Sequence, residues 1–223
     1  MCGRYTITIT LEELLALYEA EMADAAIVLP RFNIAPMQEV PVIIHDGKRN
    51  RLGQLRWGLL PYWAKADDWG AKAINARAET VKEKPAFRTL LTRKRCIVPA
   101  DGFYEWKRSG KDKQPYRIVL RDGGLFAMAG LYDTWIGPDG KKISTVTVIT
   151  TAPNELVADI HNRMPVILRR EDEAAWLSRD NQDQDALLDL LKPYDASQMR
   201  AYKVSSAVGN VRNVSEDLIK EVK

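Results

Sequence analysis

Cys2 is the first residue with the means to do covalent chemistry, and it directly follows Met1 in a chain with only one other cysteine, Cys96. Removal of Met1 would leave Cys2 with an α-amine and a thiol on adjacent carbons. Their reference pKa values, about 7.7–8.0 and about 8.5, leave part of each group nucleophilic near neutral pH. An aldehyde reacts first with the amine to give an imine, and the thiol then closes a five-membered thiazolidine ring. The alternative interpretation is a small residue that happens to follow Met1.

Glu105 and His161 are candidates for moving protons. Glu105 lies in the stretch DGFYEW, where strand alternation places it on the same face as Phe103. Partial burial there would raise its pKa toward general acid–base use, whereas an exposed edge-strand carboxylate would not have that role. His161 follows a helical pattern and precedes a strand, so it is either a proton-transfer group near pH 7 or a helix-capping residue. The other histidine, His45, is expected to be a solvated turn residue.

Asn75 and Arg77 alternate with apolar residues in the stretch INARAE and therefore share one polar face. This pattern indicates either ligand contact or a buried hydrogen-bond network. An asparagine both donates and accepts hydrogen bonds, which suits it to orienting an amine or a sugar hydroxyl. An arginine suits a bidentate contact to phosphate.

Arginines and tryptophans recur in the expected loops and strand ends, a combination that suits a basic, aromatic groove for single-stranded nucleic acid. The alternative is that the tryptophans anchor the core, as large aromatic residues usually do. We expect Trp57 and Trp106 in the core and Trp63 and Trp69 to be more exposed. The full set is Arg4, Arg31, Arg77, Arg163 and Arg212 with these four tryptophans.

The composition favours one soluble domain. With 223 residues, 46% of them hydrophobic, the chain is long enough to bury a sizeable core as a single domain over residues 1–223. A net charge of +3 does not by itself indicate a nucleic-acid partner. No CxxC or HxxxH spacing occurs, so neither a metal site nor a cofactor is expected. Without a secretory signal or a long apolar run, the protein is expected in the cytoplasm with reduced thiols, although a Cys2–Cys96 disulfide stays open.

The expected elements are mostly strands joined by short turns. Thr10 and Glu13 form a capping box ahead of a helical pattern, and the stretch RFNIAP is expected to be an ordered loop. This arrangement predicts an α+β fold, a single compact domain with an antiparallel β-barrel-like core flanked by short helices. The expected strand regions are 40–59, 95–151 and 200–206, and the expected later helices are 153–161 and 171–192.

Seven stretches of the sequence together resemble the SOS-response-associated peptidase (SRAP) family. They occur in the family's order from the first residue to near the last, and their combination with a cysteine at position two is highly specific. Residues 107–145 and 171–199 match less distinctively. The matching stretches are MCGRY (1–5), RFNIAP (31–36), RWGLLPYW (56–63), INARAET (74–80), RCIVPADGFYEW (95–106), IHNRMPVIL (160–168) and VSSAVGNVRN (204–213).

The resemblance implies a protein that recognises abasic sites in single-stranded DNA and crosslinks to them through its N-terminal cysteine. An abasic deoxyribose exists partly as a ring-opened aldehyde, the partner that the aminothiol of Cys2 prefers. By position in the family pattern, Cys2 is the nucleophile and Asn75 holds the sugar and the amine. Glu105 shuttles protons, and His161 assists the opening of the sugar ring or protonates the leaving hydroxyl.

The resemblance also assigns residues to the DNA strand. Arg4, Arg77 and Arg163 are expected to bind the phosphates that flank the lesion, and Trp63 to exclude or unstack a complementary strand. The other residues expected to contact DNA are Asn33, Pro36, Trp106 and Arg212. Abasic single-stranded DNA is then the main partner, replication-fork proteins are candidate further partners, no membrane is involved, and the DNA-bound protein is associated with the nucleoid. A one-to-one covalent trap needs only a monomer.

Two other functions fit some of the same residues. In the first, Cys2 attacks a peptide bond as an N-terminal nucleophile, with His161 and Glu105 or Asn75 as partners, and removal of Met1 is autocatalytic. In the second, the chain is a non-catalytic module that binds single-stranded DNA and has no use for a free amine. The arginine and tryptophan content of the loops favours a DNA substrate over a peptide.

Overall fold

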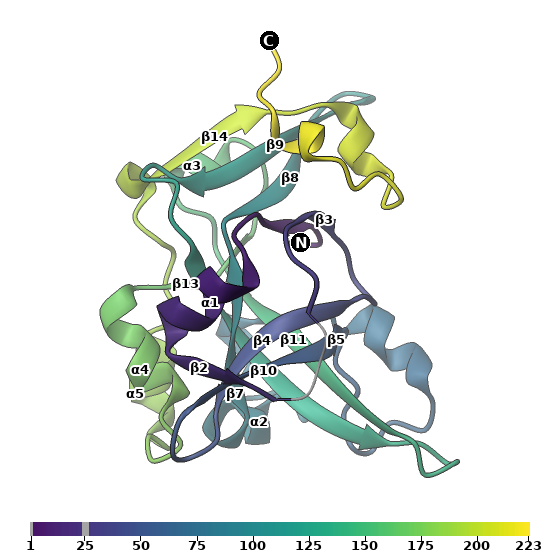
Figure 1. The fold of residues 1–223 in the computed structure, drawn as a ribbon, viewed down its shortest axis with the longest axis vertical. Coiled ribbons are helices and arrows are strands. Elements are labelled where there is room, and N and C mark those ends of the chain that lie inside the picture. Colours follow the sequence, from purple (N-terminus) through teal and green to yellow (C-terminus); the bar gives the residue numbers. More distant parts are fainter. Residues whose placement is uncertain (1, 24–26) are drawn as a thin grey trace.

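Two β-sheets form the framework of the computed structural model, which describes residues 2–23 and 27–223. The smaller sheet is antiparallel throughout and lies uppermost in Figure 1. Its strands run in the order β14-β9-β8-β1-β3. They are β1 (Tyr5–Ile7), β3 (Arg31–Ile34), β8 (Gly102–Ser109), β9 (Asp112–Leu120) and β14 (Met199–Lys203).

Five strands of the larger sheet close into a barrel. Antiparallel pairs join β11 to β10, β10 to β7, β7 to β4 and β4 to β5, and β5 then returns to β11 as a parallel pair. The predicted α+β fold with a barrel-like core is therefore confirmed, but the joint that closes the barrel is parallel. The barrel strands are β4 (Glu39–His45), β5 (Asn50–Trp57), β7 (Arg95–Ala100), β10 (Phe126–Ile136) and β11 (Lys142–Thr151).

Short strands extend the edges of the barrel. Two of them flank the end of β11, since β6 (Asn75–Arg77) pairs in parallel with Val148–Thr150 and β12 (Met164–Pro165) pairs with Thr150 and Thr151. The others are β2 (Ala20–Met22), beside β5, and β13 (Ile167–Leu168), beside β10.

Strand alternation divides the core into two faces. On β10, Ala127, Ala129 and Leu131 face a cluster that is covered by helices, whereas Phe126 and Met128 face a second cluster that includes residues of the smaller sheet. The covering helices are α1 (Leu11–Tyr18), α2 (Arg88–Arg93), α4 (Glu173–Leu177) and α5 (Gln184–Asp189) (Figure 1). The remaining helix is α3 (Glu155–Ala158), and 3-10 turns occupy Asp67–Lys72, Ala78–Thr80, Arg170–Asp172, Ala196–Gln198, Ser206–Gly209 and Glu216–Ile219. Within the described residues, no helix is long and apolar enough to cross a membrane.

The first helix begins as the sequence predicts. The Thr10 hydroxyl accepts a hydrogen bond from the Glu13 amide, and the Glu13 carboxylate accepts one from the Thr10 amide. This reciprocal pair satisfies two backbone donors that helix geometry leaves unpaired. The buried face of the helix carries Leu14 and Tyr18, so the short segment before it is held at a fixed place on the domain.

Two predicted elements differ from the structure. The first part of RFNIAP is a strand and not a loop, because Ile34 and Arg31 pair with β1. The predicted helix over 171–192 is two helices. The Arg95 guanidinium accounts for the break, since it donates to the carbonyls of Trp176, Ser178 and Asn181 at the end of α4. Asp183 then caps the start of α5.

Of the four tryptophans, Trp57 is fully buried, while Trp106 is only half-buried at the edge of the core. Trp63 is 40% exposed, and Trp69 is half-buried against the core. Both cysteines are free thiols, so the disulfide that the sequence left open does not form.

Gly130 lies in a tightly packed part of the barrel wall, where a larger residue would not fit without adjustment. A Cβ at this position would lie 2.9 Å from the Cys96 sulfur and 3.1 Å from the Thr147 carbonyl oxygen. We therefore expect Gly130→Ala to lower the free energy of unfolding by about 1–3 kcal/mol in urea denaturation, and Cys96→Ala in the same chain to recover part of the loss. Gly53→Ala is the matched control on another barrel strand, β5, because its Cβ meets only an ordinary contact at 3.6 Å. Equal stability of the Gly130 and Gly53 variants would contradict this account.

Candidate active site at the amino terminus

The pairing of β1 with β8 brings the start of the chain to Glu105. Tyr5 lies opposite Phe103 and Thr6 opposite Gly102. The next pair is held by the Tyr104 amide, which donates to the Arg4 carbonyl over 2.9 Å. Continuing this antiparallel register by one residue sets Gly3 opposite Glu105. This pairing brings the segment that contains Cys2 to the end of β8 that carries Glu105, close enough for the carboxylate to raise the pKa of the Cys2 thiol.

Cys2 is completely buried, in the cluster that also holds Tyr5 and Trp57. The two rings pack edge to face, with centroids 5.4 Å apart. Burial raises the pKa of the Cys2 thiol well above its usual range, and the nearby Glu105 carboxylate raises it further. The sulfur is thus held as a neutral thiol at pH 7.

Glu105 is 3% exposed, so of the two alternatives that strand alternation left open the buried one holds. Burial raises the pKa of its carboxyl to about 7, so the group both gives and takes protons at neutral pH. The Nδ1 atom of His161 lies 3.8 Å from Oε1 of Glu105. Burial also lowers the pKa of His161, so the imidazole is neutral at pH 7. Nδ1 accepts a hydrogen bond from the Arg163 amide over 3.2 Å, which orients the ring.

Asn75 lies on β6, opposite Val148 of β11. Its amide nitrogen donates to the Ile74 carbonyl over 3.0 Å, while its buried Oδ1 atom accepts no hydrogen bond from any described residue. A buried acceptor left without a donor is costly, so such atoms in native proteins call for an explanation. An amine or hydroxyl of a bound ligand would satisfy Oδ1. The Ile74 carbonyl also accepts from the Trp57 indole, which links β6 to the cluster around Cys2.

Arg4, Asn33 and Trp106 form an internal network beside the site. The Arg4 guanidinium donates to Oδ1 of Asn33 over 2.7 Å and to the Val208 carbonyl over 2.6 Å, and it lies over the Trp106 ring. The Asn33 amide, which is buried, donates to carbonyls of the C-terminal segment, over 2.8 Å in the case of Asn213. These residues therefore hold the 208–213 segment against the N-terminal strand.

The other basic residues predicted to contact DNA divide into two kinds. Arg163 is engaged within the fold, where it donates to both oxygens of Glu79 and to the Thr150 carbonyl. Arg77 and Arg212 are exposed, and neither guanidinium makes a hydrogen bond or ion pair to a described residue. These two guanidinium groups are open to an anionic ligand.

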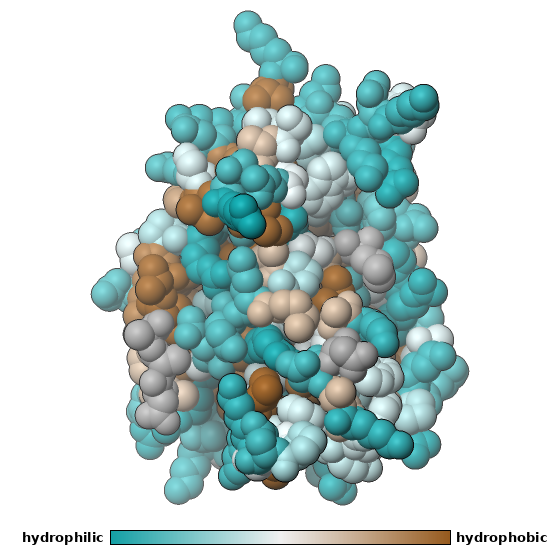
Figure 2. All heavy atoms as spheres, turned by 90° about the vertical axis from the view of Figure 1, so that its right-hand side faces the viewer, coloured by the Kyte–Doolittle hydropathy of each residue, from teal (hydrophilic) through white to brown (hydrophobic). Residues whose placement is uncertain are grey.

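Pro36 is half-exposed and precedes Met37, which is 40% exposed. The Trp63 ring packs edge to face on Trp69, with centroids 5.2 Å apart. Figure 2 shows that the face on the right of Figure 1 is mostly hydrophilic, with small hydrophobic patches.

One charged group near the site has no signal in the sequence. Arg108, exposed at the end of β8, contributes to the lowered pKa of His161 through its positive charge. Nothing in the spacing of 108 and 161 indicates this, because the two residues meet only in the folded chain. In the described part of the chain, no group of histidine, cysteine, aspartate and glutamate side chains could hold a metal ion.

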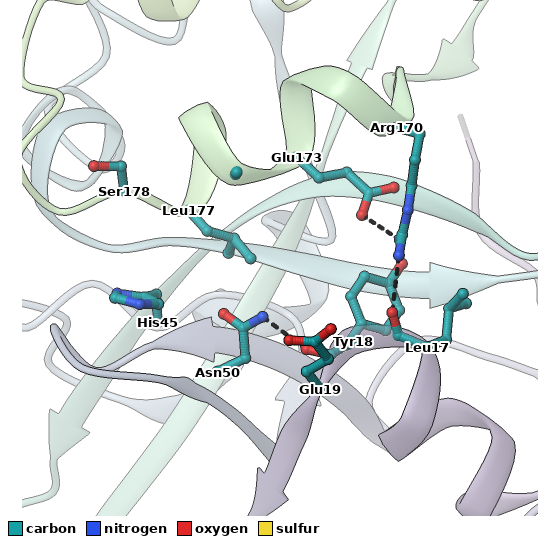
Figure 3. Close-up of a pocket in the computed structure, with 10 residues that line it drawn as sticks. Leu17, Tyr18, Glu19, His45, Asn50, Arg170, Glu173, Leu177 and Ser178 are labelled. Carbon is teal, nitrogen blue, oxygen red and sulfur yellow. Dashed lines mark hydrogen bonds and ion pairs between the residues drawn. The ribbon is translucent and has the colours of Figure 1, made fainter.

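A pocket of about 500 Å³ opens elsewhere, between the end of α1, the β4–β5 turn and α4 (Figure 3). Arg170 spans it, donating to the Glu173 carboxylate and to the Leu17 carbonyl. His45 lines this pocket and is half-buried, so it is less solvated than expected. None of the predicted site residues lines it.

Comparison with known proteins places the chain among named relatives. It is 52% identical over 221 residues to the abasic site processing protein YoqW of Bacillus subtilis, covering 98% of this chain and 99% of that protein. It is 34% identical to the abasic site processing protein HMCES of Gallus gallus, covering 82% and 64% of the two chains. The crystal structure of a protein from Bacteroides thetaiotaomicron superposes with a TM-score of 0.90 at 28% identity and full coverage of both chains.

The sequence model of one family, described as SOS response associated peptidase (SRAP), matches residues 1–211. This match spans nearly the whole chain and includes every residue of the N-terminal site except Arg212 and Asn213. The chain therefore belongs to the SRAP family.

Proposed function

We propose that this chain recognises abasic sites in single-stranded DNA and forms a covalent crosslink to them through the α-amine and thiol of Cys2, once Met1 has been removed. The names of the relatives support the processing of abasic sites. The observation that carries the finer proposal is the placement of Cys2 beside a buried carboxyl whose pKa is about 7, with His161 next to it.

The first stage joins the Cys2 amine to the sugar. The amine nitrogen adds to the C1 aldehyde of the ring-opened deoxyribose and gives a carbinolamine. Ionised Glu105 takes the proton that the nitrogen releases and returns it to the carbinolamine hydroxyl, which leaves as water and produces the imine. Asn75 Oδ1 accepts a hydrogen bond from the amine or the sugar, and His161 assists the opening of the sugar ring.

The second stage closes the ring. The Cys2 sulfur adds to the imine carbon, and its proton passes to the former imine nitrogen, so that a thiazolidine forms with no further leaving group. An imine makes the neighbouring sugar protons acidic and so promotes β-elimination and strand cleavage. Thiazolidine formation removes the imine and thereby shields the strand.

The environment of the Cys2 thiol disfavours the alternative function, a thiol peptidase. A thiol peptidase requires a thiolate paired with an imidazolium, and such thiols have depressed pKa values. Here burial raises the pKa of Cys2 and lowers that of His161, so both groups are neutral. This arrangement favours attack by the amine on an aldehyde over attack by the sulfur on a peptide.

Substitution of Cys2 tests the chemistry directly. Protein with Met1 removed, as verified by mass spectrometry, is mixed with an oligonucleotide carrying one abasic site and run on a denaturing gel. We expect a heat-stable shifted band that is absent in Cys2→Ala. In Cys2→Ser the amine remains and the sulfur does not, so we expect nicked DNA or an adduct that requires borohydride to trap. Absence of a band with the fully processed parent chain would refute the proposal.

We expect Glu105→Gln to slow crosslinking and, at high pH, to stabilise the fold. We expect the crosslinking rate to fall about 100-fold, because the proton carrier is lost.

The folded-state pKa of Glu105 is about 7 against an ordinary 4.5, so the native state binds this proton more tightly than the unfolded state. Its contribution to stability therefore falls as pH rises from 4.5 to above 7. Glu105→Gln should be more stable than the parent at pH 8, by as much as about 3 kcal/mol, with the difference vanishing near pH 4.5. Chemical denaturation at both pH values measures this, and a less stable variant at pH 8 would contradict it.

Arg77 and Arg163 should respond differently to removal. Arg77→Ala is expected to weaken binding to single-stranded DNA about equally for all sequences and to reduce the slope of log affinity against log salt by about 0.7 for a lost phosphate contact. Arg163→Ala, the control, should instead lower the melting temperature, because Arg163 joins Glu79 to Thr150. Fluorescence anisotropy at several salt concentrations measures the first effect. An unchanged salt slope for Arg77→Ala would remove this residue from the proposed DNA contacts.

A further inference from the structure

The strand that follows Cys2, β1, is very short. β1 has three residues and pairs with β8 through only two residue pairs. The Asp101 amide donates to the Thr6 carbonyl over 3.0 Å at one end, and the Tyr104 amide bonds to Arg4 at the other. On its other side β1 pairs with β3 only at Tyr5 and Ile7, with an irregularity between the two pairs. So few regular ladder bonds specify a register weakly, and a slip of one residue would turn every side chain of the strand to the opposite face. Side-chain contacts that hold β1 in place therefore help to set the position of Cys2.

Asp101 supplies contacts of this kind. Its carboxylate is 5% exposed and accepts hydrogen bonds from β1 and the residues that follow it. The Thr6 hydroxyl donates to Oδ1 over 2.5 Å, and the Thr8 amide donates to Oδ2 over 2.6 Å. The Thr8 hydroxyl also donates to Oδ2. The residue that directly precedes β8 thus binds β1 at Thr6 and the chain just beyond β1 at Thr8.

Arg117, on β9, completes the cluster. Its guanidinium is 8% exposed and donates through Nη2 to Asp101 and to the Thr6 hydroxyl, over 2.9 Å in both cases. Its Nη1 donates to the Tyr202 hydroxyl on β14 over 2.8 Å. The guanidinium packs directly on Gly102, where a Cβ would lie 2.6 Å from Nε. The residue opposite Thr6 is thus a glycine that leaves room for this contact.

Stability alone is a poor explanation for this ion pair. Removing two charges from water costs several kcal/mol each, and apolar residues of similar volume often give equal or greater stability. The best-attested use of a buried polar cluster is to specify register. Thr6 is the residue of β1 that both charged groups contact.

We propose that Asp101, Arg117 and Thr6 lock the register of β1 on β8 and are positioning residues for the crosslinking reaction, because this register sets Cys2 against Glu105. The inference rests on the proposed function. A slip of one residue would displace Cys2 by about 3.3 Å along the strand. Displacements of about 1 Å can lower the rate of a positioned reaction about 100-fold.

The test compares three threonine variants of the full chain, each with Met1 removed. Thr6→Val keeps the side-chain volume and favours a strand but removes the hydroxyl that bonds to both Asp101 and Arg117. Thr6→Ser retains the hydroxyl. Thr147→Val makes the same chemical change at a fully buried threonine of β11 whose hydroxyl has no hydrogen-bond partner in the described part of the chain.

Crosslinking is followed in single-turnover reactions with abasic oligonucleotide. The amplitude then reports the fraction of folded, reactive protein, and the rate constant reports positioning. We expect Thr6→Val to lower the maximal rate constant about 10-fold or more with unchanged amplitude and unchanged half-saturating DNA concentration. Thr6→Ser and Thr147→Val should react at the parental rate. A Thr6→Val rate equal to that of the parent, or a loss confined to amplitude, would overturn the inference.

Amide hydrogen exchange provides a second measurement that does not depend on the reaction. The amides of Asp101 and Tyr104 bond to β1, so Thr6→Val should lose protection at these two sites while the barrel strands keep theirs. If the parent chain forms no crosslink, the proposed function fails and the exchange data alone decide the register lock. Unchanged protection at Asp101 and Tyr104 in Thr6→Val would then overturn it.

Discussion

The antiparallel pairing of β1 with β8 is the constraint on which the rest of the site depends. Cys2 and the carboxyl of Glu105 come from segments about a hundred residues apart, and this short ladder brings the two segments side by side. The barrel carries β11, whereas β8 lies in the smaller sheet, between β9 and β1. The buried Asp101–Arg117 ion pair lies where β1 meets this sheet.

Burial has opposite effects on the groups at this site. The charged form of each group is disfavoured when water is removed, so the pKa of the acid and the thiol rises while that of the imidazole falls. The Glu105 carboxyl consequently titrates near pH 7 beside a neutral His161 imidazole. A group of this kind exchanges protons with small energetic cost in either direction, which a sequence of addition and dehydration steps requires. The same burial makes the native state less stable above pH 7 than a neutral side chain would.

Local patterns predicted much of this arrangement. The capping box before α1 and the hairpin strands between residues 95 and 151 follow from contacts between near neighbours. The burial of Glu105 follows from strand alternation with Phe103. The class of the fold was predictable for the same reason, since many short strands separated by turns favour an antiparallel sheet.

What the sequence could not reveal depends on contacts between distant segments. Arg4 and Asn33 are of residue types that often bind ligands at a protein surface. The folded chain instead shows them bonded to the 208–213 segment. The parallel joint between β5 and β11 has no local signature, because its two strands lie almost ninety residues apart in sequence. The break between α4 and α5 likewise depends on Arg95, which is remote from both helices along the chain.

The neutral, fully buried thiol of Cys2 has a consequence for chemical selectivity. Peroxides, disulfides and alkylating agents react with thiolates, and a thiol held protonated in an apolar cluster is a poor target for them. In the proposed reaction an aldehyde meets the amine first, and the sulfur is needed only once the imine is attached to the same residue. The burial that protects the thiol from oxidants and alkylating agents therefore does not block the proposed reaction.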